Sequence, residues 1–286
     1  MGRIDWHAGF LAAMKLELME DEDNLEFLEE QFLDGRKQRY DLLIIKNDRL
    51  VKIRNEIGTK FDKFNIVEYK NPRDGLSAEH FYRLLGYTSR YLYERHDYDV
   101  YRADAYTMTM VRHSIPREML RRLKSDGIDS REILPGIYEL SGRIPFVSQV
   151  IVTERLPGNG GHAWLKGLTN RADIRHLGSL VESSRTLDAK HKGYAEELMD
   201  VFVRANTKLM GKVKKEGGHM CRAVNELFAD EITEMKAVIA AKDEQLADKD
   251  EQLADKDEKL ADKDEQIRVL TDRVAQLEKE RRIANM

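Results

Sequence analysis

Cysteine, proline and long apolar runs are all scarce in this chain of 286 residues. The single cysteine, Cys221, excludes an internal disulfide and a zinc site built from cysteines. No apolar run approaches the roughly 20 residues that a membrane helix needs. The first residues, Met1 to Trp6, contain no basic region followed by an apolar signal segment. We therefore expect a soluble, cytoplasmic protein that makes no membrane contact.

Neither sign of charge dominates, since 48 Lys and Arg face 52 Asp and Glu for a net charge of -4. Residues 241–264 alone hold ten acidic residues and five lysines, a net of -5, so the remainder is close to neutral. Global charge therefore neither supports nor excludes nucleic-acid binding, and a local patch would be needed. Two basic clusters could contact phosphates: Arg36, Lys37 and Arg39, and Arg117, Arg121, Arg122 and Lys124.

The hydrophobic periodicity predicts an α/β fold with a mixed sheet flanked by helices. Helices are expected over residues 5–20, 77–95 and 116–125, and strands over 25–32, 39–45, 64–70, 106–112 and 144–153. Asp34-Gly35 is a turn signal between the first two strands. Helix resumes at 162–168 and continues to the end, with breaks expected at Gly193 and Gly217-Gly218.

A heptad repeat near the C-terminus predicts a long helix that pairs with a second copy. Three near copies of the heptad that begins at Ala240 end at Leu253, Leu260 and Ile267. In a coiled coil, two positions of each heptad face the partner helix. One of them holds lysine in these repeats, and its ammonium must extend out to solvent, so the middle of this helix is expected to pair weakly. We expect domains at 1–175, 176–225 and 226–286, the last a coiled coil that forms a homodimer or higher oligomer or a charged spacer.

Candidate chemistry lies in Glu68-Tyr69-Lys70, which ends an apolar strand, and in Asp41, which begins another. Residues i and i+2 of a strand share a face, so Glu68 and Lys70 project together while Tyr69 points away. If the two strands are neighbours, Asp41 joins them. Two carboxylates and the carbonyl of Tyr69 would offer Mg²⁺ its preferred oxygen ligands, and Lys70 would stabilise charge on a phosphate.

These residues resemble the PD-(D/E)xK nuclease superfamily, whose restriction-endonuclease-like core has the order αβββαβ. The wider sequence, including Phe81-Tyr82 and Gly86-Tyr87, is similar to bacterial proteins near the recombination-promoting nuclease/putative transposase family. The resemblance covers roughly residues 4 to 170. It implies Asp41 and Glu68 as metal ligands and Lys70 as a catalytic residue. Tyr40 stands where the motif has its proline.

The resemblance also implies a further helical acid, which falls on Glu17, with Glu30 as the competing residue. It implies a Mg²⁺- or Mn²⁺-dependent endonuclease that cuts DNA, linked to recombination or mobile elements. The alternative is a catalytically inactive adaptor that keeps the nuclease fold and acts through its coiled coil. The histidines, among them His7 and His80, lack metal-ligand spacing and are expected to be structural or surface residues.

Overall fold

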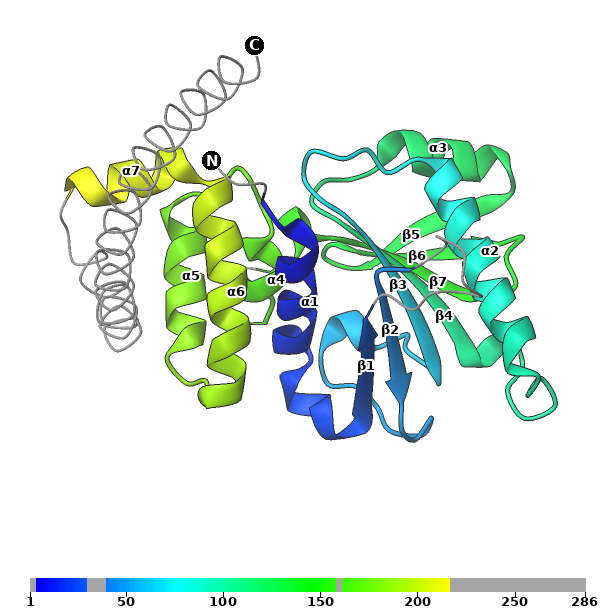
Figure 1. The fold of residues 1–286 in the computed structure, drawn as a ribbon. Coiled ribbons are helices and arrows are strands. Elements are labelled where there is room, and N and C mark those ends of the chain that lie inside the picture. Colours follow the sequence, from blue (N-terminus) through cyan, green and yellow to red (C-terminus); the bar gives the residue numbers. More distant parts are fainter. Residues whose placement is uncertain (1–3, 30–39, 158–160, 217–286) are drawn as a thin grey trace, which may run out of the picture. The chain divides into compact units, whose positions relative to one another are not determined.

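Within residues 4–29, 40–157 and 161–216, which the computed structural model describes, the chain forms a mixed sheet with helices on both faces (Figure 1). Its strands are β1 (Leu25–Glu29), β2 (Leu42–Lys46), β3 (Phe64–Lys70), β4 (Tyr106–Arg112), β5 (Ile128–Leu134), β6 (Ile137–Gly142) and β7 (Val147–Val152). They lie in the order β1-β2-β3-β4-β7-β6-β5. β4 is parallel to both β3 and β7, and the other neighbours are antiparallel. This arrangement confirms the predicted α/β class.

Two groups of helices cover the sheet. The helices are α1 (Trp6–Glu17), α2 (Ala78–Arg95), α3 (Arg117–Ser125), α4 (Ala163–Gly167), α5 (Ile174–Ser184), α6 (Ala189–Ala205) and α7 (Thr207–Glu216). One face is covered by α2 and α3, and the opposite side holds α1 and α4, backed by α5 and α6 (Figure 1). Along the chain, α1, β1, β2, β3, α2 and β4 follow one another in the order αβββαβ.

Strand β3 sends alternate side chains into these two layers. The ring of Tyr69 stacks on Phe10 of α1, with centroids 4.5 Å apart and planes 1° from parallel. Phe64 points the other way and packs against Tyr91 of α2, with ring centroids 5.7 Å apart. The strand is therefore buried on both faces, and its apolar run reflects this burial.

Helix ends follow local capping chemistry. Asp5 starts α1 by accepting a hydrogen bond from the backbone N–H of Ala8 at 3.1 Å. The predicted break at Gly193 is wrong, because α6 runs through it and a Cβ added there would meet no atom within 4 Å. The break precedes α6, where Asp188 accepts a hydrogen bond from the backbone N–H of His191 at 2.9 Å.

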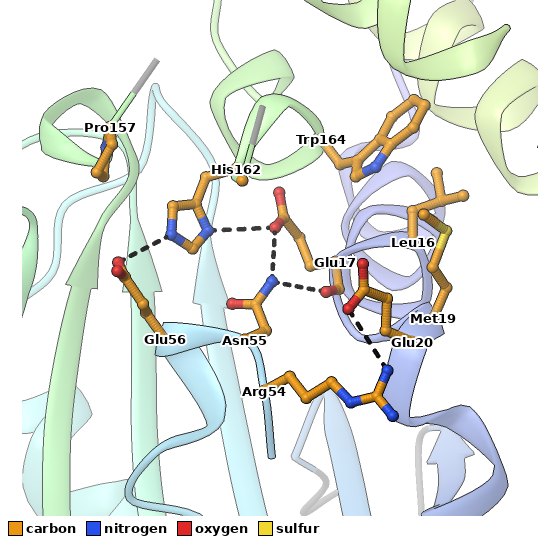
Figure 2. A pocket seen from close by; sticks show the side chains of 11 residues that line it. Leu16, Glu17, Met19, Glu20, Arg54, Asn55, Glu56, Pro157, His162 and Trp164 are labelled. Atoms are coloured by element: carbon orange, nitrogen blue, oxygen red, sulfur yellow. Dashed lines mark hydrogen bonds and ion pairs between the residues drawn. The ribbon is translucent and has the colours of Figure 1, made fainter. Parts of the chain in front are cut away.

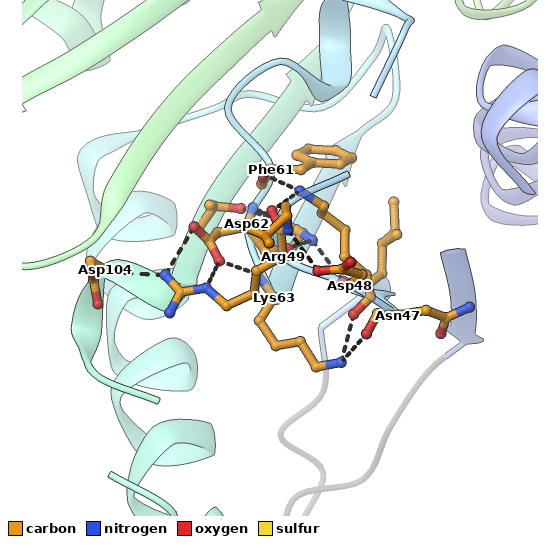
Figure 3. Close-up of polar contacts among 12 residues, drawn as sticks. Asn47, Asp48, Arg49, Phe61, Asp62, Lys63 and Asp104 are labelled. Carbon is orange, nitrogen blue, oxygen red and sulfur yellow. Dashed lines mark hydrogen bonds and ion pairs between the residues drawn. The ribbon is translucent and has the colours of Figure 1, made fainter. Parts of the chain in front are cut away.

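The long insertion between β2 and β3, residues 47–63, is tied to both strands by polar contacts (Figure 3). Arg49 forms a two-pronged ion pair with Asp62, which lies two residues before β3. The ammonium of the buried Lys46 donates to the carbonyl of Arg49 at 2.9 Å, and that of Lys63 donates to the carbonyl of Lys46 at 2.6 Å. These contacts hold the ends of the insertion together, so that β2 and β3 pair despite its length.

A hairpin of β5 and β6 was not predicted by the pattern. Its two-residue turn is Pro135-Gly136, and Gly136 has φ +79°, a value that the third residue of a type II turn requires. The strand signal was weak because β5 has exposed polar residues on both faces. The turn dipeptide was the available signal.

Replacing Gly136 with alanine is expected to lower the free energy of unfolding by about 1–3 kcal/mol, because the positive φ disfavours a side chain. The added Cβ would also lie 2.8 Å from the backbone nitrogen of Leu156. Gly86 is the matched control, since it lies within α2 with no atom within 4 Å of an added Cβ. Gly86→Ala should stabilise by about 0.5–1 kcal/mol. Urea denaturation measures the unfolding free energy of both variants. Equal effects would contradict the conformational requirement for glycine at position 136.

Contacts divide the chain into residues 1–224 and residues 225–286. Within the first of these, α5 packs on α4 and α6 packs on α1. The predicted domain boundaries at residues 175 and 225 stay predictions. The predicted coiled coil, Cys221, Glu30 and the Asp34-Gly35 turn lie outside the described residues. Among the described helices, none has the length and apolar character needed to cross a membrane.

Candidate active site

Asp41 and Glu68 are brought together by the pairing of β2 with β3. Leu42 pairs with Val67, so continuing the antiparallel register by one residue sets Asp41 opposite Glu68. Opposed residues of an antiparallel pair project to the same face. The backbone N–H of Tyr69 donates to Oδ2 of Asp41 at 2.7 Å, which fixes this carboxylate against the end of β3. The strands are thus neighbours, as the sequence argument required.

Glu68 and Lys70 meet on the face that α2 covers. The Lys70 ammonium donates to Oε1 of Glu68 at 2.7 Å. A second cation, Arg83 of α2, reaches the same oxygen with Nη2 at 3.3 Å. Glu68 is only 5% exposed, so this charged group depends on its partners.

The pKa of Asp41 is raised to about 6. Burial is the larger cause and the negative charge of Glu68 is the second, while the N–H of Tyr69 and the nearby His7 and Lys70 act in the opposite direction. The Nδ1 of His7 lies 3.6 Å from Oδ1 of Asp41. Two acids that repel one another at the end of a sheet form a place where a cation is favoured.

His80 also faces this group, although the sequence suggested a structural or surface role. It does have a structural role, because its Nδ1 accepts a hydrogen bond from the backbone N–H of Ser77 at 3.2 Å in the capping box of α2. With Nδ1 accepting, the neutral ring carries its proton on Nε2. Burial first, and then the charges of Lys70 and Arg83, lower the pKa of His80 and favour that neutral form.

The sequence pattern did not indicate that Arg83, His7 or His80 belongs to this site. A signal existed for two of them. The helix α2 begins eight residues after β3 ends, so its first turns return to the strand end, and His80 and Arg83 lie three apart on one helical face. His7 comes from the start of α1, and no spacing links it to Asp41.

Glu17 is not brought to this group, which corrects its expected place. It ends α1, ten residues after His7, and a helix rises about 15 Å over that distance. Its side chain has no exposed surface and accepts hydrogen bonds from the backbone N–H of Leu165 at 2.9 Å and from Asn55 at 3.2 Å. Nδ1 of His162 lies 3.2 Å from the same carboxylate (Figure 2).

These residues line a separate cavity of about 310 Å³ between α1, the segment at Asn55 and Glu56, and α4 (Figure 2). His162 is 3% exposed, and its Nε2 lies 3.4 Å from a carboxylate oxygen of Glu56. Burial alone would lower the pKa of His162, but Glu17 and then Glu56 outweigh it and raise this pKa. Glu17 therefore belongs to a polar link between elements, and not to the end of the sheet.

The basic cluster on α3 is partly neutralised. Arg121 forms an ion pair with Glu118, and Nε of Arg122 lies 3.8 Å from Asp126. The apolar side of this short helix is held by the buried Met119 and Leu123. DNA contact by α3 stays a prediction, and the other basic cluster, residues 36–39, lies outside the described part of the chain.

Within the described residues, no group of three or more His, Cys, Asp or Glu is arranged to hold a metal ion. The oxygens of Asp41 and Glu68 nevertheless suit a hard cation such as Mg²⁺, which takes one or two carboxylates and keeps several waters. The raised pKa of Asp41 is consistent with this fit, because a divalent cation would offset both the burial of this carboxylate, which is the main cause, and the repulsion from Glu68, which is the second.

No family model, curated protein or solved structure matches this chain. The geometry of Asp41, Glu68 and Lys70 is accordingly the main indication of function.

Proposed function

We propose that this chain is a metal-dependent DNA endonuclease of the PD-(D/E)xK type. The observation that carries the proposal is the meeting of Asp41, Glu68 and Lys70 at one end of β2 and β3. The order αβββαβ, with the acid directly before the second strand and E-x-K at the end of the third, supports it.

Asp41 and Glu68 would hold Mg²⁺ or Mn²⁺, with the carbonyl of Tyr69 as a further oxygen. Such an ion, when bound, lowers the pKa of a coordinated water and offsets charge on the phosphate. Lys70 would place its ammonium against the phosphate oxygens as charge develops there. The N–H of Tyr69 holds Asp41 in position at the end of the sheet.

Plasmid nicking in Mg²⁺ or Mn²⁺ tests the proposal. Glu68→Ala and Lys70→Ala should each abolish cleavage while circular dichroism shows a folded protein. Glu182→Ala is the matched control, since Glu182 is exposed on α5 and forms a local ion pair with Arg185. Cleavage by the Glu68 and Lys70 variants at the rate of the control would reject the assignment.

A second candidate is a scaffold that keeps this fold without catalysis and acts through the coiled coil predicted for residues 226–286. One observation favours it: Lys70 and Arg83 both contact the same oxygen of Glu68, which satisfies this carboxylate without a metal. Calorimetric titration of the full chain with Mn²⁺ separates the two. A scaffold should show the same heat of binding before and after Asp41→Asn, whereas the nuclease should lose its tightest site.

For the nuclease, two such sites would be needed to cut both strands of a duplex. The predicted coiled coil would supply them by forming a homodimer. A role in recombination or in mobile elements is part of this proposal and derives from the resemblance of the sequence.

A further inference from the structure

The carboxyl ends of the parallel strands β3 and β4 carry two cations side by side. Lys70 and Arg112 are the last residues of these strands and are paired in register, so they project to the same face. In open α/β sheets, ligands bind beyond the carboxyl ends of parallel strands. This edge is therefore the place where a substrate would lie.

The guanidinium of Arg112 has few hydrogen-bond partners among the described residues. Its Nε is buried and has no hydrogen-bond partner among the described residues. Its Nη1 makes a single long contact, 3.4 Å, to the carbonyl oxygen of Ser114. No ion pair joins Arg112 to an acid in the described part of the chain. A buried donor of a charged group is costly to leave unpaired, and an anion at this edge would satisfy it.

Arg83 adds a third cation from α2. Its Nη2 lies 3.3 Å from Glu68, yet its side chain is 39% exposed, so contact with Glu68 does not bury this cation. Lys70 and Arg83 share a single acid, Glu68, and Arg112 has no acid partner among the described residues, so these three cations outnumber the acids that they contact. This local excess favours an anion in a chain whose net charge is negative.

We propose that Arg83 and Arg112 form, beside Lys70, a phosphate-binding site that holds the backbone of a DNA strand without a metal ion. Guanidinium groups suit this role because their planar forks bind phosphate through two parallel hydrogen bonds. The inference deepens the proposed function, on which it rests for the nature of the ligand. It adds to the scissile phosphate at Lys70 the neighbouring phosphates of the same strand, which the two arginines would contact.

Fluorescence anisotropy with a labelled single-stranded oligodeoxynucleotide, in EDTA and at low salt, tests this site. Arg83→Gln and Arg112→Gln should each weaken binding by about tenfold or more, as expected for a lost charge-assisted hydrogen bond. Each should also reduce the slope of log affinity against log salt by about 0.7, the value for one phosphate contact on a single strand. Arg83→Lys should retain the slope and lose part of the affinity.

Arg185→Gln removes the same charge from an exposed position directly after α5 and should leave binding unchanged. Equal effects of the Arg185, Arg83 and Arg112 variants, or no binding by the unaltered protein, would overturn the inference. Thermal unfolding of each variant confirms that it is folded. Binding that depends on Arg83 and Arg112 without cleavage in Mg²⁺ would reject the nuclease and keep this site. Cleavage combined with binding that ignores both arginines would do the reverse.

Discussion

Replacing Asp41 with asparagine is expected to stabilise the folded protein by about 1–3 kcal/mol at about pH 8 and to remove its metal binding. The carboxyl has a pKa of about 6 in the folded protein, above its ordinary value of 3.8, so folding favours its protonated form. Its contribution to stability is therefore present below the unfolded pKa and is lost as pH rises towards 6. Asparagine keeps an oxygen that can accept from the N–H of Tyr69 but carries no charge.

Chemical denaturation of both proteins between about pH 4 and pH 8 measures this effect. The difference in unfolding free energy should grow as pH rises from 3.8 through 6 and then level off. Asp62→Asn is a control, because Asp62 pairs with Arg49 and should lose stability instead. A stability difference that is flat across this range would contradict the raised pKa of Asp41. Metal binding that survives in Asp41→Asn would contradict its role as a ligand.

Replacing Glu17 with alanine is expected to lower the free energy of unfolding by about 3–5 kcal/mol, the usual cost of removing one partner of a buried ion pair. The variant would leave the N–H of Leu165 and the buried His162 without their acceptor. Because this cluster lies away from Asp41 and Glu68, Mn²⁺ affinity in the folded variant should not change. Denaturation followed by calorimetry at a temperature where the variant stays folded gives both quantities.

The pH dependence of stability gives a second test of the contact between Glu17 and His162. The pKa of His162 is raised in the folded protein, so its contribution to stability is present below the unfolded pKa and is lost as pH rises through the folded pKa. The difference in stability between the unaltered protein and Glu17→Ala should therefore shrink above about pH 6.5. Glu17→Gln keeps an acceptor for Leu165 and should lose less stability. A loss of Mn²⁺ binding in Glu17→Ala would return this residue to the metal site.

Much of the fold follows from local sequence. The apolar strand at Phe64–Lys70 and the aromatic helix at Ala78–Arg95 are found with nearly the predicted bounds, because burial on one or two faces leaves a strong periodic pattern. The β5–β6 hairpin escaped this reasoning because its first strand is mostly exposed and polar. The helix break predicted at Gly193 was wrong because an isolated glycine that contacts no other atoms lowers helix propensity without ending a helix.

The candidate site was predictable only where its residues share a strand or adjoin one. The spacing of Glu68 and Lys70 fixes their common face, whereas the meeting of Asp41 with Glu68 was conditional on the two strands being neighbours, which β2 and β3 are. Arg83 and His7 arrive from helices on opposite faces of the sheet, and no sequence interval encodes that meeting. Glu17 was misplaced for a related reason: a helix of twelve residues has two ends, and only packing decides which end lies near the strands.

The stacking of Tyr69 on Phe10 gives the middle residue of the E-x-K tripeptide its own constraint. Glu68 and Lys70, on either side of it, are candidate functional residues, but the side chain of Tyr69 is constrained by its packing on α1. Among related sequences, the residue at position 69 should vary together with the residue at position 10, while Glu68 and Lys70 stay the same. Substitutions in this aromatic pair can therefore reorient Glu68 and Lys70 together without replacing any side chain that would touch a ligand.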